Sequence, residues 1–407
     1  MSAPVTSDVQ RSCPVCDALA GEPLHRRSFV LPDGHPLARG YTVVTCGVCG
    51  AAYATPLPDQ AAYDRFYRDA SKYADAATGT GSGAQVWDDR RLEETARALA
   101  SFAPDAATHV VDVGCGAGGL LRWLARLGYT NLTGIDPAPA CAEATEAIPG
   151  VRGLVGSLFA LPQNLKPAGL VVLSHVLEHV REAGGAIDGL EAIMRPGGRV
   201  YAEVPNASQY AEYLVAPFLD FNTEHINHFS VGTLKRLFAS HGWKVVAFGV
   251  KSIASSPTAR YPCAWVLAEL PKPGEAVEEM PPDRSLRPAL SRYVTASNTL
   301  LSRVIACCEE LGIASKEIII WGTGQTTAIL LAETPLGGAR IRAFTDSNPM
   351  HHGRTIAGAP VVPPDALRAM PTTPIVIGSL LHGAEIADVI KARGLANPVI
   401  RLDPGTS

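Results

Sequence analysis

The sequence predicts an α/β protein built from three parts, and three observations lead to this prediction. The chain has 407 residues, more than one hydrophobic core usually holds. From about residue 87, apolar strand-like runs alternate with amphipathic helical runs, as they do in parallel α/β sheets. Four cysteines lie in two pairs ahead of this alternation. We therefore expect a small N-terminal domain at 1–76, a central domain at 77–270, a linker at 271–288 and a C-terminal domain at 289–407.

Composition and charge narrow the classes of function. Apolar residues make up 47% of the chain and charged residues 18%, which suits a well-packed protein and argues against disorder. The formal net charge is −4 and no long basic run occurs, so we expect neither a nucleic-acid binder nor a membrane-surface binder. The first residues lack the pattern of a secretory signal, and no apolar stretch of about 18 residues indicates a membrane span. We expect a cytoplasmic protein, either a monomer or a dimer.

The N-terminal part holds two cysteine pairs of identical spacing. Cys13 and Cys16 form one C-x2-C pair and Cys46 and Cys49 form the other, with 29 residues between the pairs. Two such thiolate pairs complete the tetrahedral coordination that structural zinc requires, and they leave no open position for catalysis. The alternative, four unrelated core cysteines, does not account for the matching spacing. We expect a structural zinc site with a hairpin between its two halves.

The rest of the first part and the central part can be divided into helices and strands. Aromatic residues recur at helical spacing over 59–75, and the glycine-rich run at 77–83 is typical of a hinge. A helix is expected at about 138–147, and another at 181–194 that the RPGG sequence stops. Seven strand-like runs follow one another and predict a mostly parallel, Rossmann-like sheet: 108–114, 131–137, 151–157, 168–176, 199–206, 243–250 and 261–270.

A glycine-rich loop follows the first of these strands. The segment reads HVVDVGCGAGG, in which Asp112 precedes the loop glycines Gly114, Gly116 and Gly118. Glycines let a backbone turn tightly and approach a ligand closely. Asp136 ends the next strand in the sequence GIDP, where a carboxylate can accept hydrogen bonds from ribose hydroxyls. Because nicotinamide and flavin proteins use similar loops, the loop alone leaves those cofactors open.

The loop, the GIDP acid, the SHVLEHV run after the fourth strand and the RPGG before the fifth together resemble the class I methyltransferases, which use S-adenosylmethionine. The resemblance implies that the glycine loop holds the methionine part of the cofactor and that Asp136 binds its ribose. It also implies that Ser157 or Leu158 borders the adenine, although this chain has GSLF where such families often place an aspartate. The cofactor-binding set that we predict comprises Asp112, Gly114, Gly116, Gly118, Asp136, Pro137, Ser157, Leu158 and His175.

A second group of polar residues follows the fifth strand, in the sequence EHINHFS. Glu224, His225 and His228 fall within five residues, among several aromatic residues. In this fold a ligand lies beyond the carboxyl ends of the strands, where this segment is expected. A histidine there titrates near neutral pH and can act as a general base. The alternative for any one of these histidines is a structural role in the core.

The full layout resembles the three-domain sugar C-methyltransferases of deoxysugar biosynthesis. The resemblance is carried by CPVC, CGVC, VDVGCGAGG, SHVLEHV and EHINHFS, and it covers essentially the whole chain. It implies that His225 removes a proton beside the keto group of a nucleotide-linked sugar, so that the enolate carbon attacks the methyl group of the cofactor. It further implies catalytic roles for Glu224, for His179 and for Tyr73, at the end of the aromatic helical pattern.

The C-terminal part repeats the alternation of strands and helices, which predicts a second Rossmann-like domain. Asp346 ends its second strand, 22 positions after Gly324, a spacing that is compatible with a dinucleotide site. The family resemblance instead implies a domain that closes the substrate cleft, with Gly322, Thr323, Gly324 and His351 near the nucleotide part of the substrate. Two other functions stay open: an O- or N-methyltransferase of a glycan or other small natural product, and a zinc-bearing binding module without activity.

Overall fold

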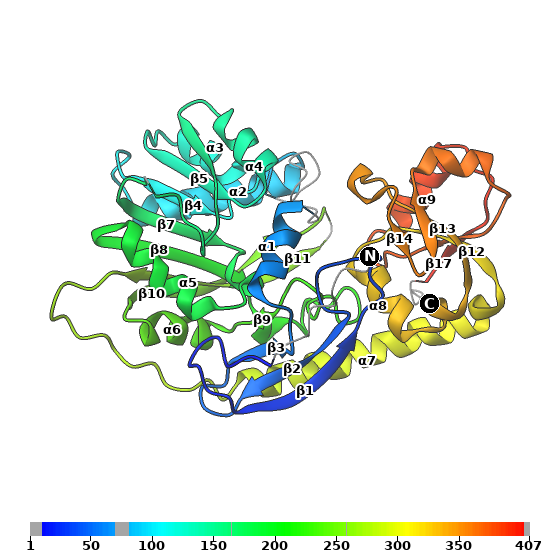
Figure 1. Ribbon diagram of the computed structural model, residues 1–407, viewed down its shortest axis with the longest axis horizontal. Helices are drawn as coiled ribbons and strands as arrows, with labels where there is room; N and C mark the ends of the chain where they lie inside the picture. Colours follow the sequence, from blue (N-terminus) through cyan, green and yellow to red (C-terminus); the bar gives the residue numbers. More distant parts are fainter. Residues whose placement is uncertain (1–9, 70–80, 164, 258, 403–407) are drawn as a thin grey trace.

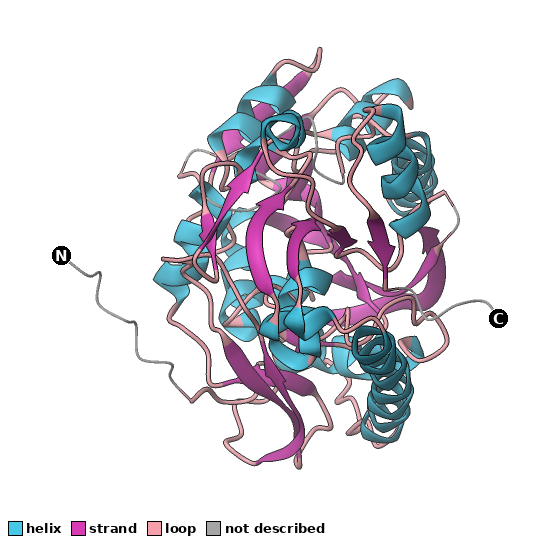
Figure 2. Cartoon of the chain, turned by 90° about the vertical axis from the view of Figure 1, so that its right-hand side faces the viewer, coloured by secondary structure: helices cyan, strands magenta, loops and turns pink. Residues whose placement is uncertain are grey.

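The computed structural model describes residues 10–69, 81–163, 165–257 and 259–402 (Figure 1). Three sheets organise these residues, with four, seven and six strands in chain order. In a view turned by 90°, helices lie on both sides of the strands (Figure 2). The predicted α/β class is confirmed. Among the described residues, no helix combines the length and the apolar character needed to cross a membrane.

The seven-stranded sheet has the order β10-β11-β8-β7-β4-β5-β6. Its first five strands in the chain pair in parallel, and the last two join antiparallel at one edge. The sheet is therefore mostly parallel, as predicted. Its strands are β4 (Val110–Val113), β5 (Leu132–Asp136), β6 (Val151–Val155), β7 (Ala168–Ser174), β8 (Met194–Pro205), β10 (Lys244–Ala254) and β11 (Arg260–Glu269).

Both faces of this sheet are covered, so its central strands are apolar on both sides. Val110 and Val172 belong to a core with α2 (Val86–Phe102) and α3 (Gly119–Arg126). Their chain neighbours Val111 and Val171 point to the other face and belong to a core with α5 (Ala183–Gly189) and α6 (Val231–Ser240). The helix α4 (Pro139–Glu146) contacts β5 and β6.

One predicted helix is shorter than expected. Residues 181–194 give only α5 and a 3-10 turn at Leu190–Ile193, and β8 already begins at Met194. The RPGG sequence lies inside β8, because Met194 pairs with Ala168 and Arg199 already pairs with Leu170. Gly197 has a φ of 68°, which allows the extra residues to loop out of the ladder as a bulge.

The four-stranded sheet combines the N-terminal part with a segment of the central part. β1 (Gly21–Ser28), β2 (Gly40–Cys46) and β3 (Ala52–Thr55) form an antiparallel meander, and β1 and β2 are the hairpin expected between the cysteine pairs. The fourth strand is β9 (Asn227–His228), which pairs antiparallel with β3. The EHINHFS segment is therefore fixed to the N-terminal sheet. The helix α1 (Gln60–Asp69) covers part of the predicted aromatic helix, and Tyr73 lies outside the described residues.

The C-terminal part begins with the long helix α7 (Leu286–Glu310), which starts inside the predicted linker and runs beside β1 (Figure 1). A six-stranded sheet of order β14-β15-β13-β12-β16-β17 follows, and only β14 is antiparallel. One hydrophobic core joins the N-terminal sheet to this part, so the domain boundaries stay a proposal. The elements are β12 (Glu317–Trp321), α8 (Gln325–Glu333), β13 (Arg340–Thr345), β14 (Thr355–Ile356), β15 (Ala359–Val362), β16 (Ile375–Ile377), α9 (Gly383–Ala392) and β17 (Val399–Arg401).

Candidate active site

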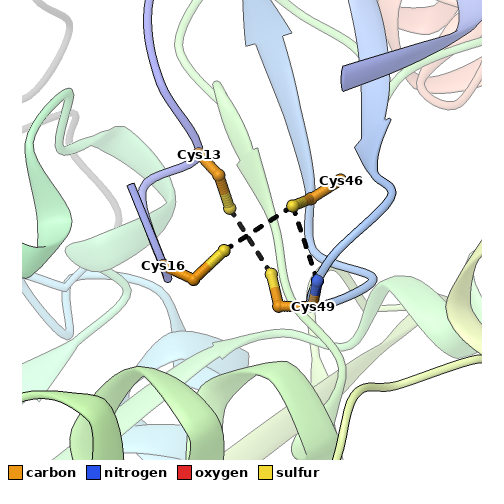
Figure 3. Close-up of side chains that lie close together, drawn as sticks. All are labelled: Cys13, Cys16, Cys46 and Cys49. Carbon is orange, nitrogen blue, oxygen red and sulfur yellow. Dashed lines mark hydrogen bonds between the residues drawn. The ribbon is translucent and has the colours of Figure 1, made fainter. Parts of the chain in front are cut away.

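The four paired cysteines converge on one point (Figure 3). The sulfur atoms of Cys13 and Cys49 are 3.5 Å apart, and those of Cys16 and Cys46 are 3.6 Å apart. All four lie within 4.8 Å of one another. With zinc–sulfur bonds of about 2.3 Å, a regular tetrahedron has sulfur–sulfur edges of roughly 3.8 Å. The sulfur positions therefore fit a four-thiolate metal site.

The backbone at each pair turns tightly enough to aim two thiols at one ion. In the first pair, Asp17 has a φ of 56° and its N–H donates to the Cys13 carbonyl at 2.9 Å. In the second pair, Gly50 has a φ of 83° and its N–H donates to the Cys46 carbonyl at 2.9 Å. A β-carbon on Gly50 would lie 1.8 Å from the Asp283 carbonyl oxygen, so this knuckle requires glycine.

The glycine loop lies between the ends of β4, β5 and β7. The Gly116 N–H donates to Asp136 Oδ2 at 2.9 Å, and the Ala138 N–H donates to Asp136 Oδ1 at 2.9 Å. Asp136 thus ties the loop to the end of β5. A β-carbon on Gly114 would lie 2.8 Å from Val176 Cγ2, which shows how closely the segment after β7 approaches the loop. Among the described residues, apart from its chain neighbours, no atom lies within 4 Å of a β-carbon built on Gly116, which leaves space there for a ligand.

Two buried carboxylates give this loop its electrostatic character. Burial raises the pKa of Asp112 to about 7, and the negative charge of nearby Asp136 adds to the effect. Burial also raises the pKa of Asp136 to about 6, although its two backbone hydrogen bonds oppose the shift. Among the described residues, no cationic side chain contributes to the pKa shift of either carboxylate. A cationic ligand would compensate their charge, and its hydroxyl groups could donate hydrogen bonds to the carboxylate oxygens. These two carboxylates therefore fit S-adenosylmethionine.

The other residues predicted to bind the cofactor lie near this loop or after the neighbouring strands. Pro137 separates Asp136 from Ala138 and is half-buried, and Leu158 is buried after β6. Ser157 closes a tight turn with Ala160, and its hydroxyl accepts a hydrogen bond from the Phe159 N–H at 3.3 Å.

His175 follows β7 in a left-handed backbone conformation, with a φ of 58°. Its Nδ1 lies 3.2 Å from Glu178 Oε1, and its Nε2 lies 3.3 Å from Glu203 Oε1. Burial alone would lower the pKa of His175, but Cys263 and these two carboxylates raise it well above its usual range. The two carboxylates favour the protonated form of His175, which does not suit a general base.

His179 and His225 form a pair of contacting rings. Their centroids are 4.9 Å apart and their planes are nearly perpendicular, at 68°. His179 Nδ1 lies 3.0 Å from the Glu224 carbonyl oxygen, and because a carbonyl only accepts, Nδ1 carries the hydrogen. The basic nitrogen of His179 is then Nε2, which lies 3.9 Å from Glu178 Oε1. The ring of Tyr67 stands edge-on to His179 at 5.7 Å.

Glu224 and His228 occupy positions that the sequence pattern alone does not show. The Glu224 side chain accepts a hydrogen bond from Gln325 Nε2 of α8 at 3.0 Å. His228 is fully buried in β9, and burial together with Arg11 lowers its pKa to about 3. His228 is therefore a neutral core residue, in line with the structural alternative for these histidines.

A cleft of about 150 Å³ lies beside Glu224, where the three parts of the chain meet. The N-terminal part contributes His35 and Phe66, and the C-terminal part contributes Gln325 and Arg354, none of which a sequence motif indicates. Thr323, Gly324 and His351 also line this cleft. The side chains of Thr323 and His351 bond to each other at 2.7 Å, and each contacts Asp346. The carboxylate of Asp346 is thus engaged inside the C-terminal part.

Part of the chain is similar to known methyltransferases. Residues 86–247 match the family described as a methyltransferase domain. The chain is 28% identical over 265 residues to the C-methyltransferase NovU of Streptomyces niveus. This match covers 61% of this chain and 60% of that protein. It is 34% identical over 121 residues to a ubiquinone biosynthesis O-methyltransferase of Methylocella silvestris, over 28% of this chain and 47% of that protein. The chain thus spans between about half and three fifths of the length of these two relatives.

Among solved structures, the chain is similar to the 1,6-didemethyltoxoflavin-N1-methyltransferase of Burkholderia thailandensis, with a TM-score of 0.40 and 18% identity. The match covers 55% of this chain and 96% of that one. A methyltransferase in complex with the Trm112 activator of Haloferax volcanii gives a TM-score of 0.41 at 18% identity, over 52% of this chain and 98% of that one.

Proposed function

Because residues 86–247 match the methyltransferase-domain family, we propose that the chain transfers a methyl group from S-adenosylmethionine to a carbon atom of a nucleotide-activated keto-deoxysugar. The observation that carries this proposal is the adjacency of two groups. The glycine loop with its two buried carboxylates packs against Val176. His179 lies three residues after Val176, and its ring contacts that of His225 from the segment after β8. A cofactor loop beside a possible base suits methylation of a carbon that must first lose a proton.

The residues of this chain would divide the work as follows. Asp136 would accept hydrogen bonds from the ribose hydroxyls of the cofactor, and Asp112 would balance positive charge from inside the sheet. When bound, S-adenosylmethionine supplies a methyl group on a cationic sulfur. The bond between sulfur and methyl breaks in the transfer, and its electron pair stays on the sulfur, which becomes neutral. His225 would remove the proton from the carbon next to the sugar ketone, and the electron pair of that C–H bond would form the enolate. The enolate carbon would then bond to the methyl group.

The cysteine cluster would hold one structural zinc ion through Cys13, Cys16, Cys46 and Cys49. Its geometry leaves no position for a substrate, so we assign it no step of the reaction. The cleft beside Glu224 would receive the part of the substrate that carries the nucleotide, and a cytoplasmic location belongs to the same proposal. The similarity to an O-methyltransferase favours one alternative: the same histidine would activate a hydroxyl of a glycan or other small natural product.

Incubation with S-adenosylmethionine that carries a labelled methyl group tests the proposed reaction. The acceptors are a panel of nucleotide-linked keto-sugars, with the corresponding sugars that lack the ketone as matched controls. We expect label in a keto-sugar product, and NMR should place the new methyl group on a carbon next to the carbonyl. Label on oxygen, or equal transfer to acceptors without a ketone, would replace C-methylation with the alternative reaction.

A further inference from the structure

Arg11 is a buried residue two positions before the first cysteine of the metal cluster, and no motif marks it. Its guanidinium donates hydrogen bonds to two segments that lie far from it in the sequence. Nη1 donates to the Arg181 carbonyl at 2.8 Å, and Nη2 donates to the Ile226 carbonyl at 3.1 Å and to Asn227 Oδ1.

Asn227 extends this contact around the turn after β7. Its Nδ2 donates to the Leu177 carbonyl at 2.8 Å and to the Val180 carbonyl at 2.7 Å. The backbone adds one more bond, from the Ile226 N–H to the Glu178 carbonyl at 2.8 Å. The guanidinium and the amide thus close a joint between residues 177–181 and residues 226–227.

This joint flanks the two histidines of the candidate site. His179 lies within the first segment, and His225 immediately precedes the second. Their rings contact each other, and His179 bonds to the Glu224 carbonyl, only while the two segments keep this register. A planar guanidinium can reach acceptors on both segments at once, whereas a lysine ammonium is a compact charge that cannot reproduce the fork.

We propose that Arg11 is a positioning residue for proton removal. It fixes the relative placement of His179 and His225 through the joint with Asn227, and it does not touch the substrate. Because it lies in the segment that leads into Cys13, it also connects the metal cluster to the histidine pair. This inference rests on the proposed function only in giving the two histidines a role in catalysis; the joint itself is independent of that role.

The variants Arg11→Met and Arg11→Lys of the full chain test the proposal. Arg199→Met is the matched control, since Arg199 of β8 also bonds a backbone carbonyl and a carboxylate, those of Phe102 and Glu269, but takes no part in the joint. For Arg11→Met we expect a roughly 10- to 100-fold lower kcat, the scale of a misplaced reacting group. The KM for S-adenosylmethionine and the zinc content should stay as in the wild type. Arg11→Lys should retain the fold with an intermediate kcat, and it replaces Arg11→Met if the latter does not fold.

A second readout does not depend on activity. Nitrogen-15 NMR of the histidine rings, assigned with a His179→Gln variant, reports which nitrogen of His179 carries the hydrogen. We expect the Nδ1–H form in the wild type and in Arg199→Met, and a mixture of forms in the Arg11 variants. Wild-type kcat together with an unchanged His179 signal in the Arg11 variants would overturn the positioning role. If the signal changes as expected but the wild type transfers no methyl group, the proposed function fails and the joint stands.

Discussion

Replacing His225 with asparagine is expected to lower turnover by about 10²–10⁴-fold, the usual contribution of a positioned general base. A proton next to a sugar ketone is weakly acidic, so its removal needs a base at the reacting carbon. The affinity for S-adenosylmethionine should change little, because the proposed contacts with the cofactor are made by the glycine loop and Asp136 and not by this ring. Steady-state kinetics at saturating concentrations of both substrates, with melting temperatures of the same samples, would measure the effect.

His228→Asn is the matched control for this variant. It makes the same substitution in the same segment, but His228 is fully buried and packs with its ring 4.6 Å from that of Phe221. We expect it to lower the melting temperature more than the turnover. Full activity of His225→Asn, together with loss of activity in His179→Asn or Tyr73→Phe, would place the base elsewhere.

Exchanging both Cys46 and Cys49 for serine is expected to remove the zinc and to destabilise the N-terminal part. Purified wild-type protein should contain close to one zinc per chain, and the double variant should contain almost none. A structural zinc stabilises its fold by several kcal/mol, and apparent binding energies of about 10–16 kcal/mol occur in zinc-finger peptides. Because β2 ends at Cys46 and β9 belongs to the same sheet, we expect turnover to fall as well.

Metal analysis and thermal denaturation of the same samples would check this expectation. Cys307→Ser with Cys308→Ser is the control for metal content, since these neighbouring cysteines lie on α7, outside the cluster. Full zinc occupancy in the Cys46 and Cys49 double variant would show that this pair does not bind the metal.

The fold of the central part could be predicted because its signals are local. Alternating apolar runs and helical periodicity mark β4 to β8 without reference to any distant residue. The bulge in β8 could not be predicted, since a bulge is defined by the register of its partner strand. The pairing of β9 with β3 could not be predicted either: it joins residues from two separate parts of the chain, and a strand of two residues has no periodicity.

The candidate site shows the same division. The cysteine pairs and the glycine loop are encoded by short spacings, so both could be read from the sequence. The sequence also indicated the EHINHFS segment, but it did not show that the Glu224 carboxylate turns to Gln325. Contacts such as those of Arg11 with Arg181 and Asn227 depend on how the N-terminal and central parts of the chain pack together. No local pattern distinguishes that arginine from a solvated one.

Under the proposed function, protonation of Asp112 and Asp136 should make cofactor binding depend on pH. Burial raises the pKa of Asp112 to about 7 and that of Asp136 to about 6 in the protein without ligand. A cationic cofactor should bind the ionised carboxylates more tightly. Its affinity should therefore be highest at a pH above the two pKa values and should fall as the pH drops through them.

Calorimetric titration of the chain with S-adenosylmethionine tests the central claim most directly, because that claim is a methyl-donor site at the glycine loop. The account predicts one site per chain, tighter binding at pH 8 than at pH 6, and no binding of a nicotinamide dinucleotide at this loop. Asp136→Ala should weaken binding by about 1–3 kcal/mol, through the loss of charge-assisted hydrogen bonds to the ribose. Unchanged affinity in Asp136→Ala, or a nicotinamide cofactor bound at the Gly114 loop, would contradict it.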